Sequence, residues 1–210
     1  MLLDDTGVVY HRLQALCYGM HYTFFDRGIY NINIIALRAL PGEPNKFDDY
    51  LSISYRRARD EPVTQAFKCT TDPGTYYLNN PMRTIGTAVI APQQVRGGMT
   101  IGNHKRLYSC LVQNKPLKVY RDNNRDSTVN YVGPTIETPN SLQIHRASAN
   151  WAVESVNKYS AGCIVVQDPK DFEEFMTIVY LSVERYGDKF TFTLIELERQ
   201  AILSVLQSGT

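Results

Sequence analysis

The chain has 210 residues, a formal net charge of +1 at pH 7, 43% hydrophobic residues and 20% charged residues. These values are ordinary for a folded protein that is long enough to bury a sizeable core. The lysines and arginines are scattered, which argues against a nucleic-acid partner. No apolar stretch approaches the roughly 20 residues that a membrane-spanning helix needs, so membrane insertion is not expected.

The first residues, MLLDDTGVVYHRLQ, open acidic and turn polar, without the basic start and apolar core of a secretory signal. We therefore expect synthesis in the cytoplasm, unless a signal has been removed. The four cysteines lie far apart and form no C-x-x-C pair, so neither a disulfide framework nor a zinc cluster is expected. No cofactor or metal is expected, because no His, Cys or carboxylate pair shows ligand spacing.

Residues 7–20 predict a short amphipathic helix, because apolar side chains recur there at helical spacing. Short alternating segments follow, separated by turn residues such as PGEPN at 41–45 and GG at 97–98. The sequence TTDPG at 70–74 is interpreted as another turn, in which Asp72 bonds the backbone and Gly74 takes an unusual φ. The predicted strands span 30–38, 49–57, 63–71, 87–92, 107–113, 117–122, 141–146, 160–166 and 190–197.

A second helix is predicted over 168–187, where Asp168 is placed to cap it and Pro169 fits its first turn. The stretch between residues 121 and 140 is polar and predicts a loop beside a site, and the residues after 197 predict a frayed tail. No linker divides the chain. We therefore predict a single domain over residues 1–210 that is mainly β with flanking helices (α+β), with a mostly antiparallel sheet or sandwich.

Chemistry is indicated by the segment IHRASANWAVESVNKYSAGCIVVQDP, residues 144–169. Cys163 follows a run of small residues and precedes an apolar strand, and His145 lies 18 residues before it. Thiol catalysis needs a thiolate, which a neighbouring imidazole promotes by taking the proton. The alternative is that Cys163 is a small buried residue and His145 a hydrogen-bonded core residue, since free cysteine is among the most buried residue types.

The pattern Ile144-His145, a loop, and then Ser160-Ala161-Gly162-Cys163-Ile164 resembles the signature of the L,D-transpeptidase catalytic-domain family. The resemblance implies a β-sandwich in which a cysteine attacks a peptide bond in the stem of peptidoglycan. It makes Cys163 the nucleophile and His145 the base. The resemblance also implies that Gly162 and Cys163 line the oxyanion hole, on a turn that begins at Ser160.

The chain departs from that family's pattern at three places. Ala161 stands where a histidine or another polar residue is usual, Val165 stands where an arginine is usual, and Arg146-Ala147 replaces a glycine and a hydroxyl residue. Longer stretches, 45–53, 70–81, 101–122 and 144–163, resemble a divergent branch of the family found in bacteriophage genomes. Hydrolysis by a phage lytic enzyme at the bacterial cell wall, after release or as part of a virion, therefore fits at least as well as transpeptidation.

Three further residues are candidates for binding substrate: His104, Arg121 and Arg146. His104 precedes a strand and either orients the substrate or the imidazole of His145, or is a surface histidine in a turn. Arg121 ends a strand and either holds a carboxylate of the peptidoglycan stem through its bidentate fork or forms a strand-end salt bridge. A catalytically inactive virion or wall-binding module with the same fold is the competing function, and the sequence leaves the oligomeric state open.

Overall fold

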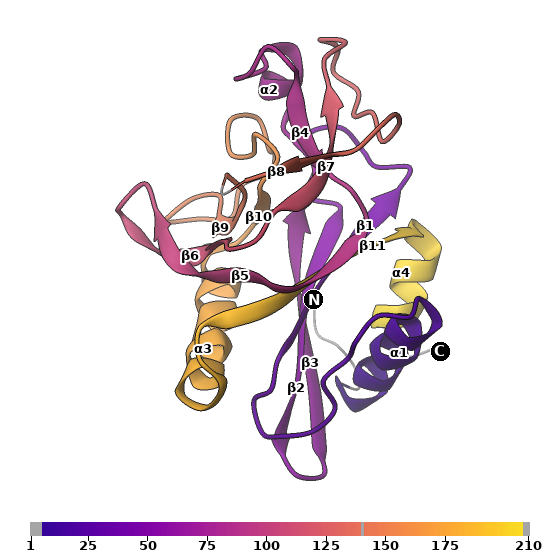
Figure 1. Cartoon of the computed structure of the whole chain (residues 1–210), viewed down its shortest axis with the longest axis vertical. Helices are drawn as coiled ribbons and strands as arrows, with labels where there is room; N and C mark the ends of the chain where they lie inside the picture. Colours follow the sequence, from indigo (N-terminus) through magenta and orange to yellow (C-terminus); the bar gives the residue numbers. More distant parts are fainter. Residues whose placement is uncertain (1–5, 140, 208–210) are drawn as a thin grey trace.

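The structure, a computed structural model, describes residues 6–139 and 141–207 of the chain. Eight strands close into a barrel (Figure 1). In barrel order they are β1 (Asn33–Leu40), β11 (Lys189–Glu198), β5 (Gln93–His104), β6 (Tyr108–Gln113), β9 (Gln143–Arg146), β10 (Ile164–Val166), β3 (Glu61–Thr70) and β2 (Asp49–Ala58). A separate three-stranded sheet has the order β4 (Thr87–Ile90), β7 (Leu117–Asp122) and β8 (Ile136–Thr138).

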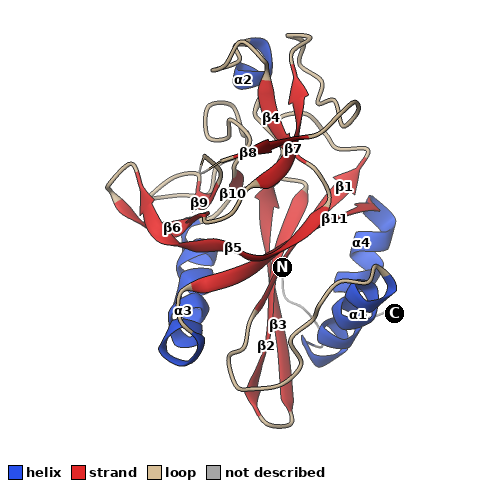
Figure 2. Ribbon diagram, viewed as in Figure 1, coloured by secondary structure: helices blue, strands red, loops and turns tan. Residues whose placement is uncertain are grey.

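Four helices accompany the two sheets (Figure 2). They are α1 (Thr6–Gly19), α2 (Thr75–Asn79), α3 (Pro169–Tyr186) and α4 (Arg199–Leu206). Helices α1 and α4 lie together on one side of the barrel, and α3 lies on another. The expectation of a mainly β protein with flanking helices is therefore confirmed, and within the described residues no helix is long and apolar enough to cross a membrane.

The large sheet is a closed barrel, where a two-layer sandwich was expected. Most neighbouring strands run antiparallel, as expected, but β1 pairs in parallel with β11, and β9 pairs in parallel with β10. The first pairing joins the beginning and the end of the chain and so closes the sheet. The second places β9, which carries His145, beside β10, which Cys163 directly precedes.

The predicted helices form where expected. Helix α1 buries the stripe of Val9, Leu13 and Cys17. Helix α3 begins at Pro169, and the Asp168 side chain accepts a hydrogen bond of 2.8 Å from the backbone N–H of Lys170, which satisfies one of the unpaired N–H groups of the first turn. Local capping residues therefore predicted this helix to within a residue at each end.

Two segments differ from the expectation. The residues after 197 form helix α4, whose Ile202 and Leu206 are buried, and not a frayed tail. Residues 93–104 form strand β5, although Gly97-Gly98 was interpreted as a turn. The two glycines lie at a β-bulge opposite the Phe190–Phe192 segment of β11, and Gly97 has a φ of +65°, so they bend the strand without ending it.

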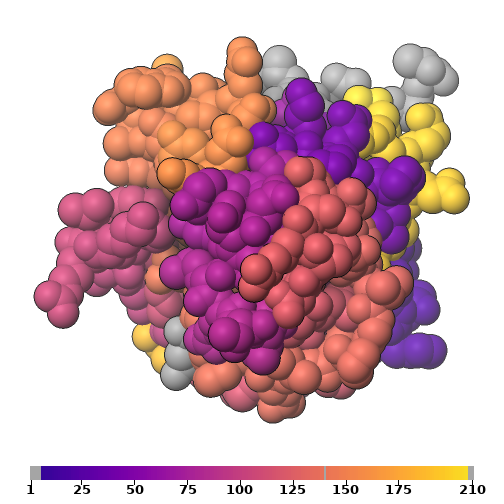
Figure 3. Space-filling model, turned by 90° about the horizontal axis from the view of Figure 1, so that it is seen from above, coloured from indigo at the N-terminus to yellow at the C-terminus, as the bar shows by residue number. Residues whose placement is uncertain are grey.

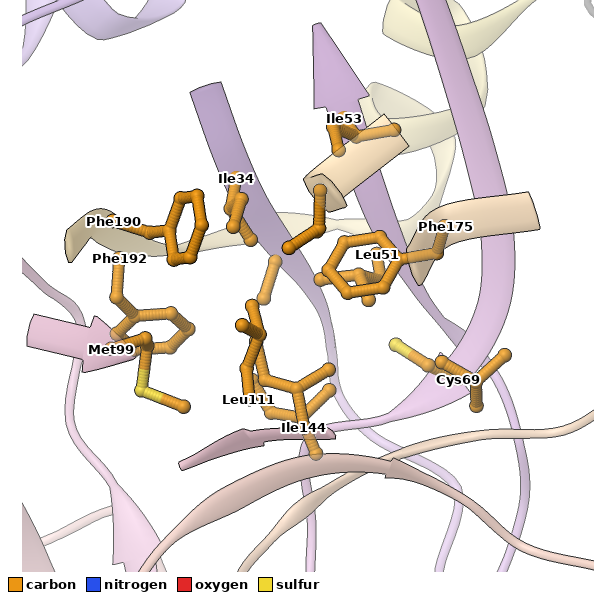
Figure 4. Packing of buried hydrophobic residues seen from close by; sticks show 14 of the residues in the cluster. Ile34, Leu51, Ile53, Cys69, Met99, Leu111, Ile144, Phe175, Phe190 and Phe192 are labelled. Atoms are coloured by element: carbon orange, nitrogen blue, oxygen red, sulfur yellow. The ribbon is translucent and has the colours of Figure 1, made fainter. Parts of the chain in front are cut away.

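One hydrophobic core is shared by the barrel, the small sheet and α3. Figure 4 shows part of it, with Phe175 of α3 close to Leu51 of β2, and Phe190 and Phe192 of β11 close to Met99. A second cluster packs α1 and α4 against the outer face of the barrel. The small sheet is therefore fixed against the barrel, at the end where the candidate site lies.

Candidate functional site

Strand β9 carries one candidate catalytic residue, and the other directly precedes the adjacent strand β10. Ile144 pairs with Ile164, and both are in the core, whereas His145 pairs with Val165. Because side chains alternate along a strand, His145 and Val165 point to the other face. Cys163, two residues before Val165, packs with it in a separate small cluster. His145 therefore lies on β9, and Cys163 lies directly before the adjacent strand β10.

His145 is 3% exposed. Its Nδ1 lies 2.8 Å from the carbonyl oxygen of Arg146. A carbonyl oxygen only accepts, so Nδ1 carries the proton and the lone pair is on Nε2. Burial lowers the pKa of His145 to about 4, the bond to Arg146 opposes this shift, and electrostatic interactions with His104 and Lys105 add to it. The imidazole is therefore neutral at pH 7, the form that can accept a proton.

His104 is the nearest support of this imidazole. The two histidine rings stack with their centroids 4.2 Å apart and an angle of 27° between their planes. His104 Nδ1 lies 2.6 Å from Oε1 of Gln143, which fixes the ring from its far side. This geometry agrees with the expectation that His104 contacts the imidazole of His145.

Cys163 is the only partly exposed thiol of the four cysteines, all of which lie in the described residues. Burial raises its pKa to about 11, while a backbone hydrogen bond from Gln143 and the charge of Lys105 lower it. Burial raises the pKa of Cys17 and of Cys110 to about 12, and that of Cys69 also well above its ordinary value. The thiol of Cys163 is therefore protonated at neutral pH, and what distinguishes it from the other three is its partial exposure.

The turn before Cys163 is fixed by Ser160. Ser160 Oγ accepts a hydrogen bond of 3.2 Å from the N–H of Gly162 and donates one of 2.8 Å to the carbonyl oxygen of Cys163. Gly162 has a φ of +116°, and a Cβ there would lie 2.4 Å from the carbonyl oxygen of Ala88. The glycine is therefore required for the turn. Its N–H is already bonded, which differs from the expected role as an oxyanion donor.

A buried charged network behind this turn was missed by the sequence analysis. Arg38 on β1 is 0% exposed; its Nε lies 3.1 Å from Asp72, and its Nη1 lies 2.9 Å from Glu196. Asp49 accepts hydrogen bonds of 2.7 Å from both the N–H and the hydroxyl of Thr71. The sequence signal for this network is the arginine within the apolar stretch NIIALRAL. An arginine in a buried strand implies charged partners, because charged residues are rarely buried without them.

The network also corrects the interpretation of TTDPG. Asp72 pairs with Arg38 and accepts a hydrogen bond from the hydroxyl of Tyr131, so its carboxylate holds two side chains. Gly74 has an ordinary φ of −70°, and its N–H donates a 2.9 Å hydrogen bond to the carbonyl oxygen of Ser160. The segment therefore links the buried charges to the turn that carries Cys163.

Two hollows flank the candidate catalytic residues. The Cys163 hollow has a volume of about 240 Å³, and its lining includes Met82, Arg83, Gly86, Arg121, Leu142 and Cys163. The His145 hollow has a volume of about 400 Å³, and its lining includes His104, Lys105, Tyr108, His145, Arg146 and Tyr159. In Figure 3, which views the molecule from above, the β5–β6 hairpin projects from one side; His104 ends β5, and Lys105 follows it in the turn.

The candidate substrate-binding residues are thus divided between the hollows. Arg121 lies in the Cys163 hollow, where its Nη1 donates a 3.3 Å hydrogen bond to the carbonyl oxygen of Gly86. Arg146 lies in the His145 hollow, where its guanidinium lies 4.3 Å from the centre of the Tyr108 ring and 3.7 Å from Glu173. Neither position contradicts a contact with substrate.

No hydrogen bond joins Cys163 to His145 within the described part of the chain. Hydrogen bonds between catalytic groups are often long or poorly aligned before substrate binds, so the lack of this hydrogen bond is compatible with a catalytic pair. Among the same residues, no group of three or more His, Cys, Asp and Glu side chains converges as a metal site would need.

Comparisons with protein-family models, curated proteins and solved structures found no match.

Proposed function

We propose that this chain is a cysteine-dependent enzyme that cleaves or transfers an amide bond in the stem peptide of peptidoglycan, in the manner of the L,D-transpeptidase catalytic-domain family. The observation that supports it is the in-register parallel pairing of β9 with β10, which places His145 beside the strand that Cys163 directly precedes. The bacterial cell wall is the place of action, reached after release or as part of a virion.

In the first step, the thiol proton of Cys163 moves to Nε2 of His145, and the sulfur attacks a carbonyl carbon of the stem peptide. The tetrahedral intermediate collapses when its C–N bond breaks, and the leaving amine takes the proton from His145. The product is a thioester on Cys163. The tautomer imposed by the Arg146 carbonyl suits this step, because it leaves the Nε2 lone pair unprotonated.

In the second step, water attacks the thioester carbon and gives a proton to His145. The C–S bond breaks, and the sulfur takes that proton back, which restores both residues. An amine in place of water gives transpeptidation by the same route. The oxyanion of each intermediate is assigned to the backbone N–H of Cys163, because the N–H of Gly162 already donates to Ser160.

The second candidate is a catalytically inactive virion or wall-binding module. It is favoured by one observation, the protonated state of the thiol, whose pKa is raised to about 11 by burial. An inactive module has no need for a partly exposed thiol at the start of a strand whose neighbour carries an unprotonated imidazole nitrogen. The enzyme is therefore preferred, and the two candidates make opposite predictions for peptidoglycan.

The test is digestion of purified peptidoglycan followed by mass analysis of the fragments. The enzyme releases fragments that differ from the intact stem by cleavage or exchange of one amide bond. Cys163→Ala releases none, and the matched control Cys110→Ala, which removes a buried thiol nearby, still releases them. Equal fragments from Cys163→Ala, or none from the folded wild-type protein, would contradict the proposal, and the second result supports the inactive module.

A further inference from the structure

The Cys163 hollow carries two arginines that lack an acidic partner. Within the described residues, neither Arg83 nor Arg121 forms an ion pair, and no aspartate or glutamate lines the hollow. Arg121 Nε is buried without a hydrogen-bond partner. Burial and the nearby charge of Arg83 both lower the pKa of Arg121. Two like charges at one wall repel each other, and an anion bound between them relieves that repulsion.

The arrangement of the two hollows assigns a direction to the substrate. The acyl group remains bonded to the sulfur after the C–N bond breaks, and the leaving amine must take its proton from His145. Cys163 lines the smaller hollow and His145 the larger one. The acyl part therefore fits the Cys163 hollow, and the leaving group fits the His145 hollow.

We infer that Arg83 and Arg121 form a carboxylate clamp, and that the acyl donor of this enzyme is a peptide residue with a free carboxylate. The assignment of the acyl donor rests on the proposed function, whereas the binding of a carboxylate by the two arginines does not. The guanidinium of arginine presents paired N–H donors that match the two oxygens of a carboxylate. The hollow, at about 240 Å³, is smaller than the ~300–1,000 Å³ of pockets for drug-sized ligands, which suits a single residue.

The clamp is tested with two alkylating reagents that differ only in charge. The rate constants for modification of Cys163 by iodoacetate and by iodoacetamide are measured in the intact protein by mass mapping. Both reagents need the same thiolate, so the ratio of the two rate constants is independent of the thiol pKa and of turnover. We expect this ratio to be about tenfold higher in the native protein than at Cys163 in the urea-unfolded protein, as charge-assisted hydrogen bonds imply.

Variants then identify the source of the preference. Arg121→Gln and Arg83→Gln each lower the ratio by about threefold or more, and because Arg83 is exposed, its variant is expected to fold. Arg59→Gln, the same change at the exposed tip of the β2–β3 hairpin, leaves the ratio unchanged (Figure 1). Lys105→Gln tests general electrostatics, because Lys105 acts on the Cys163 thiol from the other hollow.

The outcomes separate this inference from the proposed function. The clamp is overturned if the ratio of the iodoacetate to the iodoacetamide rate constant is unchanged in Arg121→Gln and Arg83→Gln. It is also overturned if Lys105→Gln lowers that ratio as much as either arginine variant does. If the clamp holds and peptidoglycan is not cleaved, only the proposed function fails. If stem peptides are cleaved, the free carboxylate and its carboxamide are compared at the acyl residue. The kcat/KM for the carboxylate is then about tenfold higher, and Arg121→Gln removes that difference.

Discussion

Ser160 Oγ donates a hydrogen bond of 2.8 Å to the carbonyl oxygen of Cys163, so Ser160 at the start of the turn fixes the backbone of Cys163 at its end. The same oxygen accepts from the N–H of Gly162, and the Ser160 carbonyl oxygen accepts from Gly74. Ser160 is fully buried. Its part in the site is therefore to fix the position of the sulfur.

Ser160→Ala is expected to destabilise the fold by about 1–3 kcal/mol, because it leaves buried backbone groups at Gly162 and Cys163 without a partner. Urea unfolding measures the change in the free energy of unfolding. The matched control is Ser148→Ala, whose hydroxyl makes an exposed hydrogen bond to the N–H of Asn150 and whose loss is expected to change stability by less than about 0.5 kcal/mol. Equal stability of Ser160→Ala and wild type would contradict the role assigned to this hydroxyl.

Gly162→Ala is expected to destabilise the fold by more than about 2 kcal/mol, since it combines a strained φ with a close contact at the Ala88 carbonyl oxygen. Gly133→Ala separates the two effects. Gly133 also has a positive φ, of +97°, but a Cβ there meets nothing within 4 Å. Its cost is therefore the strain alone, about 1 kcal/mol. If the two variants unfold at the same urea concentration, the contact with Ala88 does not constrain the turn.

Cys163 is expected to be the most reactive thiol of the native protein toward iodoacetamide. It is partly exposed, whereas the other three cysteines are buried. Because its pKa is raised to about 11, its labelling rate should rise about tenfold for each pH unit between about pH 7 and pH 10. Mass mapping of the labelled peptides gives the rate at each cysteine. Faster labelling elsewhere, or a Cys163 rate that is already maximal at neutral pH, would not agree with this site.

Elements with strong local signals were predictable from the sequence. Helix α3 has a capping aspartate and a proline in its first turn, and β7 spans the expected residues 117–122. Strand β5 was missed because glycines signal a turn and a β-bulge equally well, and only the pairing with β11 distinguishes them. The closure of the barrel by β1 and β11 has no local signal, because their residues are more than 150 positions apart.

The candidate site was predictable as a set of residues but not as an arrangement. The segment 144–163 identified Cys163 and His145, and their strands are adjacent. The division of the site into two hollows depends on the small sheet, whose place against the barrel is set by the shared core. The support from Arg38 and Asp49 was not predictable, because it comes from residues more than 100 positions before Cys163.

The buried His145 should make stability depend on pH. Its pKa in the folded protein is lowered to about 4 from an ordinary 6.5. The unfolded state therefore binds the proton first as the pH falls, and stability is lost between about pH 6.5 and pH 4. Between about pH 7.5 and pH 4.5, the wild-type protein should lose about 2–3 kcal/mol more than His145→Gln, as measured by urea unfolding at both values. Other titrating groups, such as Asp49, are common to both proteins. A loss of the same size in both proteins would contradict the lowered pKa.

His145→Ala distinguishes the catalytic role from a packing role. If His145 is the base, peptidoglycan cleavage per folded molecule falls by about 10²–10⁴-fold, because general-base assistance contributes about that much. Thermal unfolding checks that the variant is folded, since the loss of the stacked ring also removes its contact with His104. His104→Ala is the matched control: it removes the other ring of the stack but leaves the Nε2 lone pair of His145, so cleavage should fall far less. We expect the two variants to unfold at similar temperatures and to differ in turnover. Full turnover in a folded His145→Ala protein would refute the assignment of this residue as the base.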